Sequence, residues 1–324
     1  MTLVYAKIVF ISRVLIEELC RVGVLRIIYD NSFVHFYELI ILLMPKSFRV
    51  LVQYGCPQHL LSRLAGLIAE CRWKWVKNCA IKLLINRHKV NVSEALLENL
   101  EDYPTFNSFF TRQLKLAVRP IAPGENCIIS PVDGCISQIG HIKENSIFQA
   151  KKFYFNTTTL LGGSSELAEL FENGYFATFY LAPKDYHRVH MPLAGTLRKT
   201  IYIPGKLFSV NYVTTQTIPN LFARNERLVC LFDTIAGPMV VILVGAMLVG
   251  SIQTVWPMPA RSAKKRVTEE DYSYEIFLER SAELGCFKMG STAIVLFAKD
   301  KINWLPTLKE NGVVKMGQAV GEAK

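Results

Sequence analysis

The sequence lacks the features of a disulfide-linked or zinc-binding protein. Its eight cysteines are scattered along 324 residues, and no two of them have CxxC spacing. Their arrangement argues against a disulfide scaffold or a zinc ribbon and favours a reducing compartment. The apolar N-terminal segment has no small-residue cleavage motif, and Lys7 and Arg13 interrupt it. A secretory signal peptide is therefore not expected.

Acidic residues are scarce relative to basic ones. The chain has 37 Lys and Arg against 27 Asp and Glu, a net charge of +10. Such a charge favours polyanionic partners, namely nucleic acid, anionic lipid headgroups or acidic substrates. With 51% hydrophobic and only 20% charged residues, the chain is not mainly disordered. Its length allows one large domain or two small ones, each with a buried core.

One long segment, residues 234–260, carries no charged side chain and is a membrane-spanning candidate by hydropathy alone. Gly237, Pro238, Gly245 and Gly250 interrupt it, and its apolar blocks are short and partly β-branched. These features are typical of strands rather than of one helix. We predict two buried strands joined near Gly245.

The N-terminal third predicts helices. In residues 58–86, apolar side chains recur every three or four positions, at Leu60, Leu64, Leu67, Ile68, Cys71 and Trp75. Basic residues are interspersed among them, at Arg63, Arg72, Lys74, Lys77 and Lys82. Such a helix can lie in a membrane interface or pack on its own domain, and the pattern alone leaves both alternatives open. Residues 91–116 predict further short helices.

After Arg119-Pro120, short β-branched runs alternate with Gly, Pro and Asn, a pattern that predicts strands and turns. We expect residues 258–275 to form an exposed loop. The predicted fold class is α+β, with N-terminal amphipathic helices followed by a β-rich, mainly antiparallel catalytic core.

Three short motifs can carry chemistry. Asp133 in Ser-Pro-Val-Asp-Gly lies in a turn signal, where an acid is either structural or catalytic. His187 and His190 suit proton transfer, although one packed and one exposed histidine would give the same spacing. No complementary cysteines or carboxylates predict a metal site. Gly290-Ser291 precedes a strand and is either an ordinary turn or a point where the hydroxyl attacks the preceding carbonyl.

In combination, these motifs resemble the bacterial phosphatidylserine decarboxylases, enzymes that carry a pyruvoyl prosthetic group. The resemblance begins near Met44 and runs to the C-terminus. It rests on these blocks in the family's order: SPVDG at 130–134, YHRVHMP at 186–192, PGKLFSVN at 204–211, NLFARNERLVCLFDT at 220–234 and FKMGST at 287–292. Met289 replaces the family's usual leucine, a conservative change in volume and polarity.

The resemblance implies that the chain cleaves itself between Gly290 and Ser291. Ser291 would attack the Gly290 carbonyl, giving an ester, and elimination and hydrolysis would leave a pyruvoyl group at the start of the small chain, residues 291–324. The large chain would comprise residues 1–290. His190 is the implied base, oriented by Asp133, in a triad used once on the protein itself.

For the mature enzyme, the resemblance implies that the pyruvoyl ketone forms a Schiff base with the amine of phosphatidylserine and accepts the electrons left by CO2. His187 is the implied proton donor to the resulting carbanion. Hydrolysis would then release phosphatidylethanolamine. No metal or added cofactor is implied.

A lipid substrate favours membrane contact for the basic helix and makes nucleic acid an unexpected partner. We therefore expect a peripheral enzyme on the cytoplasmic face of the cell membrane, assembled from both chains of one precursor, in a family that tends to dimerise. The expected organisation is an apolar extension (1–43), a helical membrane-associating region (44–118) and a β-rich catalytic domain (119–324).

Residues 1–43 lie outside the resemblance and leave two alternatives. They are either an extra apolar membrane segment or an artefact upstream of a true start at Met44. Poor helix caps and the absence of an amphipathic period favour the second alternative.

Two rival functions fit parts of the sequence. A serine hydrolase could use Asp133, His190 and Ser291 on an external ester, since this chain order occurs in one known triad, but no Gly-x-Ser-x-Gly motif surrounds Ser291. A non-enzymatic basic membrane scaffold would explain the charge and the helix but not the three motifs. Either rival would remain a single chain.

Overall fold

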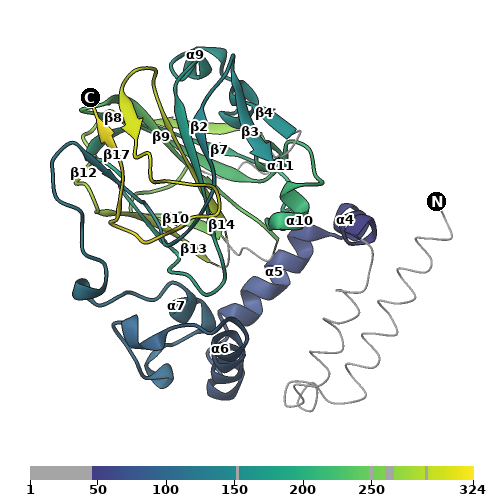
Figure 1. The fold of residues 1–324 in the computed structure, drawn as a ribbon. Coiled ribbons are helices and arrows are strands. Elements are labelled where there is room, and N and C mark those ends of the chain that lie inside the picture. The colour runs from purple at the N-terminus through teal and green to yellow at the C-terminus, as the bar shows by residue number, and fades with distance from the viewer. Residues whose placement is uncertain (1–45, 151–152, 248–250, 260–265, 289–290) are drawn as a thin grey trace. The chain divides into compact units, whose positions relative to one another are not determined.

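A computed structural model describes residues 46–150, 153–247, 251–259, 266–288 and 291–324 (Figure 1). The chain divides into two compact units, Met1–Gly55 and Cys56–Lys324. In the first unit the described element is helix α4, Lys46–Gly55. Residues 1–43, for which we weighed an apolar membrane segment against an artefact upstream of Met44, lie outside the described residues.

The second unit begins with two helices where the periodicity predicts one. Helix α5 spans Gln58–Ala69, and α6 spans Lys74–His88. Glu70, which follows α5, accepts hydrogen bonds from Asn107 Nδ2 at 3.0 Å and from Lys288 Nζ at 2.9 Å. The prediction of one continuous helix is therefore wrong, because the chain turns where distant residues bind Glu70 rather than at a glycine or a proline.

Helix α5 turns its polar side inward and its apolar side outward. Gln58 and Ser62 are buried, and Gln58 Oε1 accepts a hydrogen bond from the backbone N–H of Leu207 at 2.8 Å. We call the outward residues the α5 apolar face: Leu60, Leu61, Leu64, Leu67 and Ile68. Leu67 is 72% exposed. The helix therefore packs on its own unit through its polar side, and its apolar stripe stays exposed on that unit.

Lys77 also departs from expectation, because it is buried rather than a surface charge. Its ammonium donates to the carbonyls of Leu100 and Glu101, each at 3.2 Å. The remaining N-terminal elements are short, as predicted: the 3₁₀ turns Val92–Glu94, Leu100–Asp102 and Leu116–Val118, and helix α7, Phe106–Phe110. None of the helices that the structure describes has the length and hydrophobicity needed to cross a membrane.

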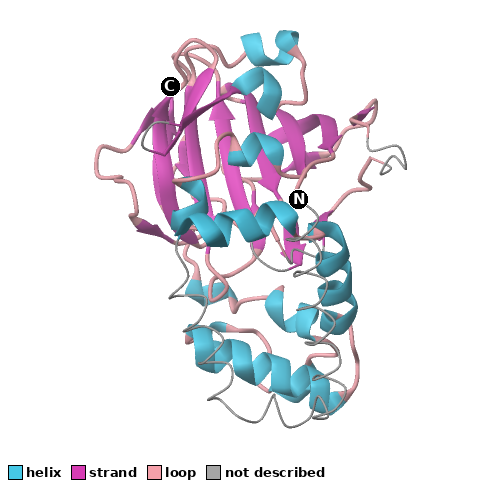
Figure 2. Ribbon diagram, turned by 90° about the vertical axis from the view of Figure 1, so that its right-hand side faces the viewer, coloured by secondary structure: helices cyan, strands magenta, loops and turns pink. Residues whose placement is uncertain are grey.

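The body of the unit is built from strands. Figures 1 and 2 show that they cluster on one side of the unit, while helices α5, α6 and α7 lie on the other. The largest sheet has nine strands in the order β11-β7-β8-β9-β14-β5-β2-β16, with β12 also paired to β7. Its members are β2 (Gly134–His141), β5 (Tyr175–Leu181), β7 (Gly195–Ile203), β8 (Arg227–Thr234), β9 (Gly237–Val244), β11 (Thr268–Asp271), β12 (Phe277–Leu278), β14 (Ser291–Phe297) and β16 (Val313–Val314).

Three smaller sheets lie beside the large one. One three-stranded sheet has the order β1 (Cys127–Ile129), β17 (Ala319–Ala323), β15 (Ile302–Trp304), and another has the order β10 (Ser251–Thr254), β13 (Glu283–Lys288), β6 (Arg188–His190). The third is the pair β3 (Ser146–Ala150) and β4 (Phe153–Asn156). The pairings of these described strands are antiparallel, which confirms the predicted α+β class with a mainly antiparallel core. Short helices connect the strands: α8 (Thr157–Leu160), α9 (Ser165–Glu169), α10 (Tyr212–Thr215) and α11 (Leu221–Arg224).

The main core fills the space between the large sheet and the two three-stranded sheets. Phe179 and Val295 of the large sheet belong to the same buried cluster as Val189 and Phe287 of the β6–β13 sheet and Val320 of β17. Apolar side chains from both layers therefore exclude water from the region where β6, β13 and β14 approach one another.

The uncharged segment 234–260 contains strands β9 and β10, which confirms the preference for two strands over one spanning helix. The prediction of an exposed loop at 258–275 is wrong in part. Residues 268–271 form β11, which pairs with β7 at the edge of the large sheet. Two of its four residues are exposed and carry carboxylates, and this polar edge composition hides the strand from a sequence pattern.

Candidate active site

Strand pairing brings the predicted histidines to the segment that leads to Ser291. Strand β6 pairs with β13, and the carbonyl of His187 accepts a hydrogen bond from the N–H of Phe287 at 3.0 Å. Strand β13 ends at Lys288, and β14 begins at Ser291 in the middle of the large sheet. Gly290 and the side chain of Ser291 lie outside the described residues, so the flanking strands alone locate the predicted cleavage bond.

The Asp133 motif is adjacent to the histidine motif. The N–H of His190 donates to the carbonyl of Pro131 at 2.8 Å, and the N–H of Ile129 donates to the carbonyl of Pro192 at 3.0 Å. Three segments that are far apart in sequence therefore meet, and backbone hydrogen bonds hold them together.

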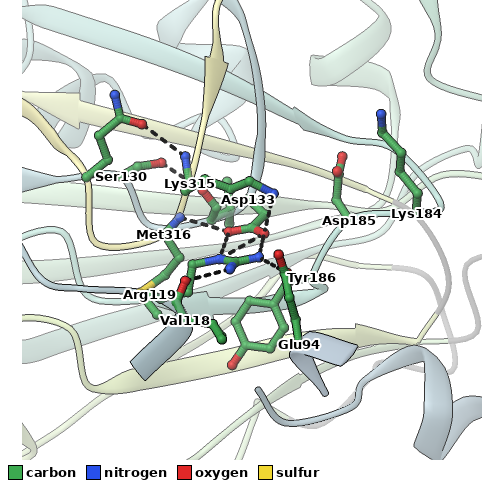
Figure 3. Close-up of polar contacts among 12 residues, drawn as sticks. Glu94, Val118, Arg119, Ser130, Asp133, Lys184, Asp185, Tyr186, Lys315 and Met316 are labelled. Atoms are coloured by element: carbon green, nitrogen blue, oxygen red, sulfur yellow. Dashed lines mark hydrogen bonds and ion pairs between the residues drawn. The ribbon is translucent and has the colours of Figure 1, made fainter. Parts of the chain in front are cut away.

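Asp133 is a buried carboxylate with several donors (Figure 3). Arg119 Nε lies 2.9 Å from its Oδ1, the N–H of Met316 donates to the same oxygen at 2.9 Å, and Lys315 Nζ lies 3.3 Å from Oδ2. Burial alone would raise the pKa of Asp133, but these hydrogen bonds and charges lower it overall. Asp133 is therefore ionised near neutral pH.

Arg119, which the sequence marks only as the start of the β-rich region, links Asp133 to the 3₁₀ turn that contains Glu94. Its guanidinium also binds Glu94 Oε2 at 2.6 Å, and its side chain is 6% exposed. A buried arginine with two carboxylates keeps its charge, and these contacts raise its pKa despite burial. The local sequence around Arg119 does not reveal its role, since its partners Asp133 and Glu94 are 14 and 25 positions away.

His190 is oriented by groups other than Asp133. Its Nδ1 lies 2.8 Å from the carbonyl oxygen of Ser281, and its Nε2 lies 2.9 Å from the hydroxyl of Tyr186. A carbonyl can only accept, so Nδ1 carries the proton and Nε2 accepts from Tyr186. Burial lowers the pKa of His190, while the Ser281 hydrogen bond and then the charges of Glu283 and Asp133 act in the opposite direction. The ring is therefore neutral, with its lone pair on Nε2.

His187 is fully buried, and its ring packs against Phe110 with 4.1 Å between centroids. Its Nδ1 donates to the carbonyl of Asp185 at 2.9 Å, so its lone pair is also on Nε2. This Nε2 has no hydrogen-bond partner among the described residues. Burial lowers the pKa of His187 to about 3. His187 is therefore a dry, neutral acceptor when nothing is bound.

Asp185 and Tyr186 complete the site but were not candidates from sequence. Asp185 Oδ2 accepts a hydrogen bond from the N–H of Ala182 at 2.7 Å, and burial, followed by the charge of Asp133, raises its pKa. Asp185 directly precedes the Tyr186-His187 motif, which is the signal that could have found it. Asp133, Asp185 and Tyr186 all line one pocket of about 330 Å³.

Comparisons with known proteins give one consistent result. The family model described as "Phosphatidylserine decarboxylase" matches residues 106–322, and a second model, described as "PSD", matches residues 48–89. A phosphatidylserine decarboxylase proenzyme of Pseudomonas putida strain GB-1 is 53% identical over 277 residues, covering 84% of this chain and 96% of that protein. The proenzyme of Pseudomonas fluorescens strain Pf0-1 is 52% identical over 284 residues, with 86% and 99% covered.

Proposed function

The chain belongs to the phosphatidylserine decarboxylase family, and we propose that it converts phosphatidylserine to phosphatidylethanolamine and CO2 with a pyruvoyl group made from its own Ser291. The precursor would cleave between Gly290 and Ser291 into residues 1–290 and 291–324. The observation that carries this proposal is the buried Nε2 of His187, which has no hydrogen-bond partner among the described residues and lies beside the strand that leads to Ser291.

For self-cleavage, His190 is the base that we assign to the Ser291 hydroxyl. Its Nδ1–H is held by the Ser281 carbonyl, and burial keeps the ring neutral, so Nε2 can take up a proton once the Tyr186 hydroxyl turns away. Once protonated, the ring is stabilised by the Ser281 carbonyl and then by the charges of Glu283 and Asp133, so Asp133 acts through its charge and not through a direct hydrogen bond.

A pyruvoyl group supplies a ketone that bonds to the substrate amine and takes up the electron pair left by CO2. The described residues fit such a group, because His187 offers a bare acceptor nitrogen at a water-excluded position beside the β13–β14 segment. A seryl headgroup brings an ammonium, which must lose a proton before its nitrogen can form a bond.

We assign that proton to His187. Its Nε2 accepts the proton from the substrate ammonium and later returns it to the carbon that has lost CO2. The exchange balances, since the histidine ends neutral as it began. Burial, which lowers the pKa of His187 to about 3, makes the protonated ring a strong acid toward the carbanion.

We infer that the enzyme is peripheral at the cytoplasmic face of the cell membrane. The α5 apolar face supports membrane contact, as do the exposed rings of Trp73 and Trp75 in and before α6. Arg63, Arg72 and Lys74 are exposed beside these apolar groups and would attract anionic lipid.

The test is the mass and composition of the purified protein. Wild type should run as two chains, and borohydride with substrate should trap the substrate covalently on the small chain. Ser291→Ala should remain one inactive chain, and His190→Ala should cleave slowly or not at all. A purified wild-type protein that is a single unbroken chain with an unmodified Ser291 would contradict the proposal, as the serine hydrolase and the membrane scaffold both predict.

A further inference from the structure

Arg112 is a buried cation with unused donors. Its side chain is 4% exposed, and one hydrogen bond joins its Nη2 to the carbonyl of Lys184 at 3.2 Å. Its Nε and Nη1 have no partner among the described residues, and the guanidinium lies 5.3 Å from the centroid of the Phe109 ring. Nε and Nη1 together carry three N–H bonds, and burying these without an acceptor is costly. Such an arrangement indicates that an anion completes the site.

Arg112 lines the pocket of about 330 Å³ that also contains Asp133 and Asp185. The lining has five cationic side chains and three acidic ones, so it carries an excess of positive charge. Arg119 and Lys315 are paired with Asp133, and Arg119 also binds Glu94. This pairing leaves Arg112, together with the exposed Lys89 and Lys184, to face an incoming anion.

This pocket is next to the residue that would become the pyruvoyl group. Ser291 pairs with Leu181 in the sheet, and Ala182, the following residue, lines the pocket. Adjacent strands lie about 4.8 Å apart, so the pocket wall is within a headgroup's length of Ser291. A second pocket of about 570 Å³ shares Cys135 and Tyr180 with this one, but no cation lines it among the described residues.

We propose that Arg112 binds the phosphodiester of the phospholipid headgroup in this pocket, assisted by Lys89 and Lys184. The proposal rests on the proposed function and deepens it, since it assigns the group that recognises the substrate. Three bonds separate the reacting amine from the phosphate-ester oxygen of a serine headgroup, so a short headgroup can reach from the strand that holds Ser291 into the adjacent pocket.

The carboxylate of the headgroup is the other anion that could occupy the site, and catalysis argues against it. Its negative charge leaves the carboxyl carbon as CO2 forms. A guanidinium bound to it would therefore stabilise the ground state more than the transition state and slow the reaction. The phosphodiester keeps its charge throughout, so binding it costs no rate.

The experiment measures equilibrium binding of water-soluble headgroups to the uncleaved Ser291→Ala precursor by calorimetry. The probes are glycerophosphoserine, glycerophosphoethanolamine, serine and inorganic phosphate. We expect the first two to bind alike and more tightly than phosphate, and serine to bind at least tenfold more weakly. Tighter binding of serine than of glycerophosphoethanolamine would assign the site to the carboxylate, and tightest binding of phosphate would assign it to the free ion; either result overturns the proposal.

Arg112→Gln should weaken both headgroups by about tenfold or more, because charge-assisted hydrogen bonds are lost. Arg198→Gln is the matched control, since Arg198 is exposed and pairs with Asp233 on the surface. If Arg112→Gln fails to fold, the double variant Lys89→Gln and Lys184→Gln, which changes exposed side chains, should still weaken binding severalfold. Unchanged affinity in the folded variants overturns the proposal.

Failure of this inference is distinct from failure of the proposed function. The binding measurement needs no pyruvoyl group, so it gives the same result whether or not the chain decarboxylates anything. Self-cleavage and decarboxylation, conversely, are scored on the wild-type protein without reference to Arg112.

Discussion

Two histidines that lie three positions apart, His187 and His190, have different surroundings, and these surroundings favour different roles. Both rings carry their proton on Nδ1, because each Nδ1 faces a backbone carbonyl. The Nε2 of His190 is met by the Tyr186 hydroxyl, whereas that of His187 has no partner among the described residues. Burial lowers the pKa of both rings. The pair is therefore arranged to accept protons at two separate points.

His187→Ala should leave self-cleavage intact and lower decarboxylation by about a hundredfold to ten-thousandfold, the usual contribution of a proton-transfer group. A denaturing gel scores cleavage, and CO2 release from phosphatidylserine scores turnover. His141→Ala is the control, since His141 is exposed on β2. Full turnover by the His187 variant would refute its role.

At the scale of elements, helix α5 and strand β2 each have a residue pattern that their packing explains. Helix α5 buries Gln58 and Ser62 and exposes leucines, which is the reverse of a helix that covers a core. Strand β2 starts at Gly134, where an added Cβ would lie 2.2 Å from the carbonyl oxygen of Tyr180 on β5. The glycine of the Asp133 motif therefore serves strand pairing, while Asp133 itself carries the charge.

Replacing Leu64 and Leu67 by glutamine should weaken binding to vesicles of anionic phospholipid by at least about tenfold, because each buried leucine contributes roughly 1.5–3 kcal/mol. Sedimentation with vesicles measures this binding. Self-cleavage should be unchanged. Leu116→Gln is the control, since Leu116 is 99% exposed on a 3₁₀ turn outside the α5 apolar face. Equal loss in the control would argue against a specific role for α5.

Gly134→Ala should destabilise the protein, because the new methyl group would collide with β5 backbone that cannot move freely. Overpacking of this kind costs about 1–3 kcal/mol, a fall of several degrees in Tm. Thermal melting of the Ser291→Ala precursor measures it. Gly140→Ala on the same strand is the matched control, since its nearest contact is an ordinary 3.7 Å to Phe176. Equal melting temperatures for both variants would count against the close approach.

At the scale of the whole molecule, burying neutral histidines in the folded unit makes its stability depend on pH. The unfolded chain binds a proton at His187 below about pH 6.5, whereas the folded chain does not until about pH 3. Between these values the unfolded state holds more protons, so acid favours unfolding. Above pH 6.5 the buried, neutral His187 costs the folded state nothing. As the pH falls from 6.5 toward 3, its lowered pKa reduces the free energy of unfolding progressively.

The unfolding free energy of the Ser291→Ala precursor should therefore fall as the pH is lowered from 6.5 to 5. Adding His187→Gln should reduce this slope by about 1 kcal/mol per pH unit, since one titrating group is removed. Urea unfolding at several pH values gives both slopes. Identical slopes with and without His187 would show that the ring takes up protons alike in the folded and unfolded states, which contradicts its lowered pKa.

Much of the fold could be predicted from local patterns. The short apolar blocks at 239–244 and 293–297 became buried strands because their residues are apolar on both faces. The break between α5 and α6 could not be predicted, since it depends on Asn107 and Lys288 holding Glu70. Strand β11 was missed because its residues are mostly acidic and its pairing to β7 is remote.

The candidate site likewise has a part that the sequence predicted and a part that it did not. The motifs containing Asp133, His187 and His190 were found from sequence, and the structure places them side by side. The expected orientation of His190 by Asp133 is supplied by Ser281 and Tyr186, and Arg119 holds Asp133. Ser281 lies 91 positions from His190 and Arg119 lies 14 positions from Asp133, beyond the range of a local pattern, whereas Tyr186 lies only four positions from His190 in the same motif.

The sequence by itself determined which groups are available: the strand-forming runs, the two histidines, the carboxylate at 133 and the Gly290-Ser291 pair. Only the tertiary structure decided their chemical states. Proton positions and pKa values follow from burial and from hydrogen-bond partners, which antiparallel pairing brings together from distant segments. A histidine's identity is local, but the burial of His187, and an Nε2 that no described residue contacts, arise only where β6, β13 and Phe110 meet.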